Sequence, residues 1–101
     1  MKICLLDNTE FAYSYEDKHS EKLRGAETVL INLYYELTKI GHDVYVFNNC
    51  SNKIHNNNSK WFNLNALSSQ SEIFFDVAFA NADVNLFDKI LSHKKFVISY
   101  S

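Results

Sequence analysis

The chain of 101 residues is poor in glycine, and this scarcity excludes several common ligand-binding motifs. It contains two glycines, Gly25 and Gly41, and no proline. A dinucleotide fingerprint, a phosphate-binding P-loop and the nucleophile elbow of hydrolases each need at least two glycines within a few residues. Gly25 and Gly41 are far apart in the sequence, so none of these three motifs is present.

The sequence also lacks a metal-binding pattern, a strong charge and a long apolar run. The four histidines, His19, His42, His55 and His93, have no metal-type spacing, and no metal or cofactor is expected. The net charge of −2 gives no general attraction to nucleic acid. The apolar run before Asp7 is too short for a signal peptide or a membrane span, which predicts a cytoplasmic protein.

The two cysteines are not expected to form a disulfide. Cys4 lies near the start of one expected strand and Cys50 lies just past the end of the next. If these strands are parallel neighbours, the two residues differ by about five strand steps, or roughly 15 Å. A disulfide requires Cα atoms within about 7 Å of each other. Both cysteines are therefore predicted to be free thiols.

The residues that are present favour one small folded domain over residues 1–101. Hydrophobic residues make up 47% of the chain and aromatic residues 15%, which is enough for a core. A helix is expected from Ala26, with Gly41 at its end and a strand over residues 43–47. The apolar positions of this helix recur every three or four residues and should face the core: Val29, Leu30, Leu33, Tyr34, Leu37 and Ile40.

Gly25 marks a candidate anion site at the start of this helix. It has no Cβ, so a ligand can approach its backbone closely. The amide groups of Ala26, Glu27 and Thr28 in the first turn have no partner within the helix and would point at that ligand. Glu27 has the favourable sign for the helix dipole, and we expect this role rather than that of a catalytic acid. The pattern indicates a site for phosphate.

The remaining segments alternate between strand and helix patterns. Residues 2–6 read as a central strand, and the long segment 7–24 is either a solvated loop or an acceptor-binding loop with tyrosines that stack on sugar rings. Further along, we expect a short edge strand over residues 61–64, a weak helix over residues 65–74 and a buried strand over residues 76–80. A helix capped by Asn81 should follow over residues 82–92, and a last strand with an exposed apolar face over residues 95–100.

This order predicts an α/β fold, a Rossmann-like doubly wound parallel sheet with right-handed crossovers and helices on both faces. Because the order stops after a fourth or fifth strand, we expect the chain to be the first part of a longer protein. Ligands of such sheets bind outside the carboxyl ends of the strands. That rule selects, together with Gly25, the residues Asp7, Asn8, Asn48, Asn49, Asn81, Asp83, Tyr100 and Ser101.

Several of these segments together resemble the start of glycosyltransferase family 4, whose members have the GT-B fold. The resemblance rests on residues 2–6, on Arg24-Gly-Ala-Glu27, on the apolar face of the helix and on residues 41–47. The family usually has a second glycine where this chain has Arg24. The resemblance covers the first half of the sequence more closely than the second.

The resemblance implies a function and a division of labour. The N-terminal half of such enzymes mainly binds the acceptor, and its glycine loop touches the phosphate of the nucleotide-sugar donor. Gly25 and the helix start would take the diphosphate, and Arg24 could add a phosphate contact. The donor-binding domain, with its pair of glutamates, is absent from these residues, and the catalytic residues are unknown.

The acceptor implied is a glycan or a lipid-linked molecule. The cluster of His93, Lys94 and Lys95 is expected to be a solvated helix end, with peripheral membrane contact as a second possibility. The alternative to a transferase is a non-catalytic Rossmann-like module that binds a ligand or a partner protein.

Overall fold

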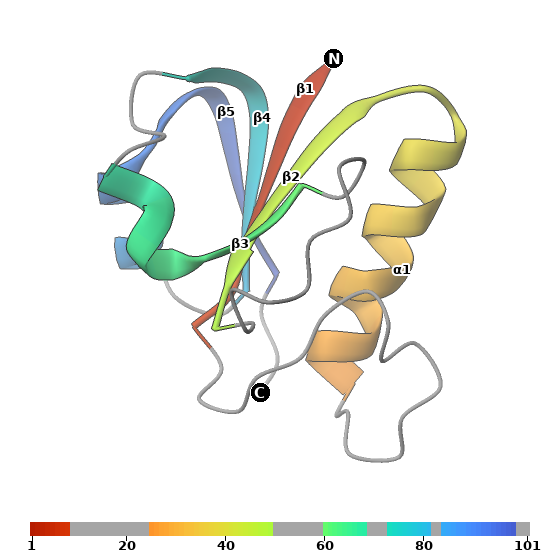
Figure 1. Cartoon of the computed structure of the whole chain (residues 1–101), viewed down its shortest axis with the longest axis horizontal. Helices are drawn as coiled ribbons and strands as arrows, with labels where there is room; N and C mark the ends of the chain where they lie inside the picture. The colour runs from red at the N-terminus through yellow and green to blue at the C-terminus, as the bar shows by residue number, and fades with distance from the viewer. Residues whose placement is uncertain (9–24, 50–59, 69–72, 82–83, 99–101) are drawn as a thin grey trace.

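A computed structural model describes residues 1–8, 25–49, 60–68, 73–81 and 84–98 of the chain. These residues form a five-stranded, entirely parallel sheet with the strand order β3-β2-β1-β4-β5 (Figure 1). The strands are β1 (Lys2–Leu6), β2 (Asp43–Asn48), β3 (Trp61–Asn63), β4 (Phe74–Asn81) and β5 (Leu91–Ile98). The helical elements are the α-helix α1 (Gly25–Lys39) and the 3₁₀-helices η2 (Leu64–Ser68) and η3 (Val84–Lys89).

The strand order confirms the predicted doubly wound sheet. From β1 the chain moves outward through β2 to β3, and it then returns to the other side of β1 to add β4 and β5. Right-handed crossovers in opposite directions place the connecting elements on opposite faces of a sheet. Accordingly, α1 packs on one face, and η2 and η3 pack on the other. The expected helices on the second face are short 3₁₀-helices.

The helix α1 presents a buried face that differs in part from the predicted stripe. Leu30, Ile31 and Tyr34 are buried against the sheet, and Glu27 lies on the same face with 1% of its surface exposed. Ile40 was expected on this face, but 68% of it is exposed. That prediction was wrong because α1 ends at Lys39 and the chain turns away one residue later.

Gly41 ends α1 as predicted. It has a φ of 99°, the left-handed conformation that glycine adopts without steric cost. The amide of His42 donates to the carbonyl of Leu37 at 3.0 Å, and the amide of Gly41 donates to the carbonyl of Thr38 at 3.1 Å. This pair of hydrogen bonds is a Schellman motif, which satisfies the last carbonyl groups of the helix.

The hydrophobic core has two halves, one on each face of the sheet. The half beneath α1 joins helix residues to alternate residues of the first three strands: Ile3, Leu5, Leu30, Ile31, Tyr34, Val44, Val46 and Trp61. The half beneath η2 and η3 uses the opposite residues of the strands and the apolar residues of the two 3₁₀-helices: Cys4, Leu6, Phe47, Leu67, Phe75, Ala78, Ala80, Leu86, Phe87 and Ile90.

The last part of the described chain contradicts one sequence prediction. A helix was expected over residues 82–92, but η3 ends at Lys89 and β5 already begins at Leu91. The reason is the long pairing between β4 and β5, which aligns Phe74 with Leu91 and Asn81 with Ile98. The cluster of His93, Lys94 and Lys95 therefore lies on an exposed edge strand and not at a helix end.

The middle of the chain matches its prediction in part. The expected edge strand is β3, which lies at one end of the sheet. The expected weak helix over residues 65–74 is reduced to η2, and Phe74 belongs to β4. Cys4 is a buried free thiol as expected, while Cys50 lies outside the described residues. Among the described residues, no helix is long and apolar enough to cross a membrane.

Candidate functional site

Three polar side chains form a row across the carboxyl ends of neighbouring strands. The register pairs Leu6 of β1 with Phe47 of β2 and with Ala80 of β4. One residue further along each strand, Asp7 therefore lies between Asn48 and Asn81. The amide of Asp7 donates to the carbonyl of Phe47 at 3.0 Å, which continues the β1–β2 pairing to this point. We call Asn48, Asp7 and Asn81 the polar row.

The polar row faces the side of the sheet that α1 covers. Side chains alternate between the two faces of a strand. Asp7 follows Ile3 and Leu5 at intervals of two, Asn48 follows Val44 and Val46, and all four apolar residues belong to the core beneath α1. Phe79, two residues before Asn81, packs against the same core. The row thus continues the apolar surface beneath α1 with polar groups.

All three side chains of the row are removed from solvent. The exposed fraction is 1% for Asp7, 0% for Asn48 and 4% for Asn81. Buried polar groups are costly unless they have hydrogen-bond partners. Asp7 and Asn48 each have at least one interaction partner. By contrast, the side-chain oxygen of Asn81, Oδ1, has no hydrogen-bond partner within the described part of the chain.

The N-terminus of α1 lies at the same edge of the sheet as the polar row. The C-terminal end of α1 leads directly into the start of β2, so the helix runs antiparallel to the strands and begins near their carboxyl ends (Figure 1). Glu27, in the first turn, is buried on the face that packs against the sheet. Gly25 is the first residue of the helix and is exposed to solvent.

The backbone at Gly25 is open to a ligand. A Cβ atom placed on Gly25 would meet no atom of the described residues within 4 Å. Gly25 has no positive φ, unlike Gly41, so its backbone does not require glycine. Among the described residues, no packing contact therefore requires glycine at this position. The first amides of a helix bind anions where a ligand can reach them.

The predicted site residues are thus brought together in part. Asp7, Asn48, Asn81, Gly25 and Glu27 share one edge of the sheet, and so do Asn8 and Asn49, whose side-chain Nδ2 donates to the Asn8 carbonyl at 3.3 Å. Ala26 is the second residue of α1, so its backbone lies in the first turn of the helix. Four of the predicted residues lie outside the described residues: Arg24, Asp83, Tyr100 and Ser101.

The burial of Glu27 was missed by sequence reasoning. Glu27 precedes Leu30, Ile31 and Tyr34 by three, four and seven positions, which is the spacing of one helical face. A carboxylate in line with an apolar stripe was the available signal. The orphaned oxygen of Asn81 could not be found in the same way, because the hydrogen-bond partners of a buried side chain depend on residues that are distant in the sequence.

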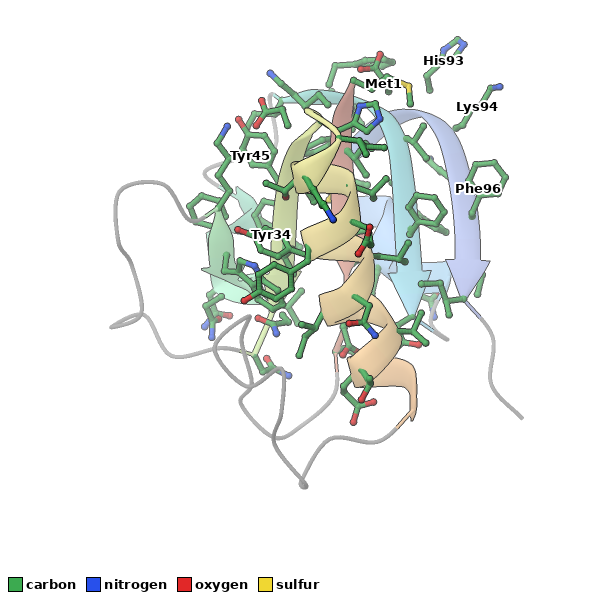
Figure 2. The ribbon with its side chains drawn as sticks, turned by 90° about the vertical axis from the view of Figure 1, so that its right-hand side faces the viewer. Met1, Tyr34, Tyr45, His93, Lys94 and Phe96 are labelled. Carbon is green, nitrogen blue, oxygen red and sulfur yellow. The ribbon has the colours of Figure 1, made fainter. Side chains whose placement is uncertain are left out.

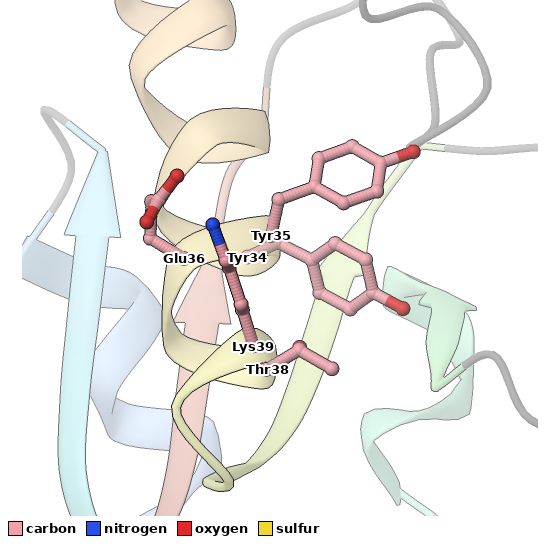
Figure 3. Close-up of a pocket in the computed structure, with 5 residues that line it drawn as sticks. All are labelled: Tyr34, Tyr35, Glu36, Thr38 and Lys39. Carbon is pink, nitrogen blue, oxygen red and sulfur yellow. The ribbon is translucent and has the colours of Figure 1, made fainter.

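An open surface pocket of about 420 Å³ lies elsewhere on α1. Figure 3 shows its lining, Tyr34, Tyr35, Glu36, Thr38 and Lys39, on the second half of the helix. The two tyrosine rings meet edge to face with centroids 5.3 Å apart, and Tyr34 meets Trp61 in the same way. These rings serve the packing of α1 on β3. None of the residues of the polar row lines this pocket.

The site at the carboxyl edge offers two kinds of chemistry. The first amides of α1 are donors for an anion, and the polar row with Glu27 is rich in oxygen acceptors. Within the described ranges, no group of three or more histidine, cysteine, aspartate or glutamate side chains could hold a metal ion. No family model matches the chain, and neither curated proteins nor solved structures show significant similarity to it.

Proposed function

We propose that this chain is the acceptor-side, N-terminal part of a glycosyltransferase of the GT-B type. The enzyme would transfer a sugar from a nucleotide-sugar donor to a glycan or lipid-linked acceptor. The observation that carries the proposal is the open backbone at Gly25, at the start of α1 and beside the buried polar row. In the family that the sequence resembles, the phosphate of the nucleotide-sugar donor binds at this place.

The strand order supports the proposal, because β1 lies at the topological switch point of the sheet. The chain leaves β1 in one direction towards β2 and in the other towards β4. The crevice outside the carboxyl ends of two such strands is where open α/β sheets bind their ligands. Asp7 and Asn81 lie at the carboxyl ends of β1 and β4, which meet at this switch point.

The chemistry expected at Gly25 is electrostatic. Negative charge develops on the diphosphate of a nucleotide sugar as the bond to the sugar breaks. Fixed amide dipoles at a helix N-terminus stabilise such charge without having to reorganise during the reaction. In the architecture that the sequence resembles, a second domain holds the nucleotide and closes the cleft. The proposal therefore includes such a domain in the whole protein, which would work in the cytoplasm.

The test is a transfer assay on the whole protein and on the 101-residue chain. The whole protein should release nucleotide from a nucleotide-sugar donor in the presence of acceptor. The isolated chain should show no turnover above a boiled control, because it supplies one wall of the cleft. Turnover by the isolated chain would contradict the two-domain proposal, and so would a whole protein that binds ligand but never turns it over.

One observation favours the alternative of a binding module. On the edge strand β5, Phe96 is 50% exposed and Val97 is 41% exposed, next to the basic cluster of His93, Lys94 and Lys95. An apolar and basic strand edge of this kind suits a partner protein or an anionic membrane surface. This second function would be favoured if a partner binds the chain and the whole protein shows no turnover.

A further inference from the structure

Asn81 has an unsatisfied acceptor at the centre of the candidate site. Its side chain is 4% exposed, and Oδ1 has no hydrogen-bond partner within the described part of the chain. A buried amide oxygen without a partner destabilises the fold, because the loss of its hydration is not compensated. Such a group is rare in folded proteins and needs an explanation.

The position of Asn81 suggests the explanation. Asn81 ends β4 and lies beside Asp7 in the polar row, on the face that α1 covers. The first turn of α1, with open space at Gly25, lies at the same edge of the sheet. A ligand that enters here would meet helix amides at one end and the acceptor oxygen of Asn81 at the other.

We propose that Asn81 is a ligand-binding residue that hydrogen-bonds a hydroxyl group of a phosphate ester. The phosphate would lie at the N-terminus of α1, and a hydroxyl on the same molecule would donate to Asn81 Oδ1. This inference rests on the proposed function for the position of the phosphate. It adds the residue that would recognise a hydroxyl group of the phosphate ester, Asn81.

A hydroxyl group fits Asn81 better than the alternatives do. It donates to Oδ1 and, if the amide is turned over, it accepts from Nδ2, so it satisfies Asn81 in both orientations. A second anion would be repelled by the buried carboxylates of Asp7 and Glu27. A metal ion would need a larger ligand group than the described residues provide.

The test compares two phosphate esters of equal charge and similar length in titrations of the 101-residue chain. Glycerol 3-phosphate carries two hydroxyl groups, and n-propyl phosphate carries none. Uncharged glycerol is the third probe. Nuclear magnetic resonance would follow the backbone amides of Gly25, Glu27 and Thr28 and the side-chain amide of Asn81.

Both esters should shift the helix amides, and only glycerol 3-phosphate should shift the Asn81 amide. Its affinity should exceed that of propyl phosphate by about tenfold, the usual effect of one hydrogen bond to a buried group. In Asn81→Leu this preference should disappear while propyl phosphate still binds. Asn32→Leu is the matched control, since Asn32 is exposed on α1, and it should keep the preference.

Asn81→Leu should also leave the thermal midpoint unchanged or raise it, because it replaces an unsatisfied acceptor by an apolar group of similar size. A large loss of stability would assign Asn81 to the fold and overturn the inference. Equal affinities for the two esters, with no shift of the Asn81 side-chain amide, would also overturn the inference. That result would leave the phosphate site intact. If glycerol shifts the Asn81 amide but neither ester shifts the helix amides, the hydroxyl contact of Asn81 is supported and the phosphate site at α1 is contradicted.

Discussion

Asp7 and Asn81 lie side by side at the carboxyl ends of β1 and β4, because the parallel register of these strands pairs Leu6 with Ala80. Both side chains are buried, and one carries a carboxylate while the other has an amide oxygen without a partner among the described residues. The two residues are more than seventy positions apart in the sequence. Only the doubly wound topology brings them together at the switch point of the sheet.

A first prediction concerns the charge of Asp7. Its carboxylate lies near the proposed phosphate position and opposes the binding of an anion. Asp7→Asn keeps the shape of the side chain and removes the charge, so the affinity of the chain for inorganic phosphate should rise by about fivefold. Titration followed by the Gly25 amide measures this. Asp88→Asn, at an exposed position on η3, should change nothing. Equal affinity in the two variants would place the phosphate elsewhere.

A second prediction concerns the thiol of Cys4. Burial raises its pKa well above the ordinary value, so the reactive thiolate is scarce at neutral pH, and the side chain is fully buried. In a Cys50→Ser variant, alkylation of Cys4 at about pH 8 should proceed only through unfolding and should accelerate steeply with denaturant. Rapid labelling of the native chain without denaturant would show that the core beneath η2 and η3 opens locally.

A third prediction concerns stability at high pH. The side chain of Lys60 donates to the Asp43 carboxylate, which raises the pKa of Lys60 above its ordinary value of 10.5, although partial burial acts in the opposite direction. The folded state therefore favours protonated Lys60. This contribution is complete below the pKa of the unfolded chain and is lost as the pH rises through the folded pKa.

The thermal midpoint should accordingly fall as the pH rises above about 10.5, the ordinary pKa of lysine, and it should fall less in Lys60→Gln, which lacks the titrating group. Lys95→Gln is the control, because Lys95 is exposed on β5. Identical pH profiles for wild type and Lys60→Gln would mean that the pair with Asp43 adds nothing to stability.

A fourth prediction concerns the edge strand β5. Phe96 stacks on Phe79 with ring centroids 5.5 Å apart, yet it remains 50% exposed because α1 does not extend over this part of the sheet (Figure 2). Exposed apolar strands at sheet edges promote self-association. The isolated chain should therefore associate at high concentration, and Phe96→Lys should weaken this by about tenfold or more. Sedimentation that shows a wild-type monomer at high concentration would contradict the prediction.

Local patterns were sufficient to predict the first half of the fold. Residues 25–47 contain an apolar stripe, a glycine in the left-handed conformation and an alternating strand, and each of these acts through near neighbours in the sequence. They gave α1, its end at Gly41 and β2 correctly. The parallel, doubly wound class followed from the alternation of strands and helices.

Non-local pairing decided the parts that were predicted wrongly. Ile90 and Phe87 have helical spacing, and both are buried, but the segment after them pairs with β4 along its whole length. Pairing energy of this kind depends on residues distant in the sequence and overrides local preference. Similarly, the strand ends predicted Asp7, Asn48 and Asn81 as site residues, but their common face and burial required the register.

The most direct test of the phosphate site is Gly25→Val, measured beside Gly41→Val in the whole protein. A Cβ atom at Gly25 would meet no atom of the described residues within 4 Å, so the Gly25→Val protein should keep its thermal midpoint. Its turnover should fall by about 10²-fold or more, because the side chain blocks the anion from the helix amides. Gly41 has a φ of 99°, so Gly41→Val should lower the midpoint and leave the turnover of the folded fraction nearly unchanged.

Arg24→Ala should reduce turnover less than Gly25→Val does, since the helix amides remain in place. The decisive measurement is turnover and thermal midpoint on the same Gly25→Val preparation. We predict a folded protein with little activity. A folded Gly25→Val protein with unchanged turnover would contradict the phosphate site at the N-terminus of α1, and with it the basis of the proposed function.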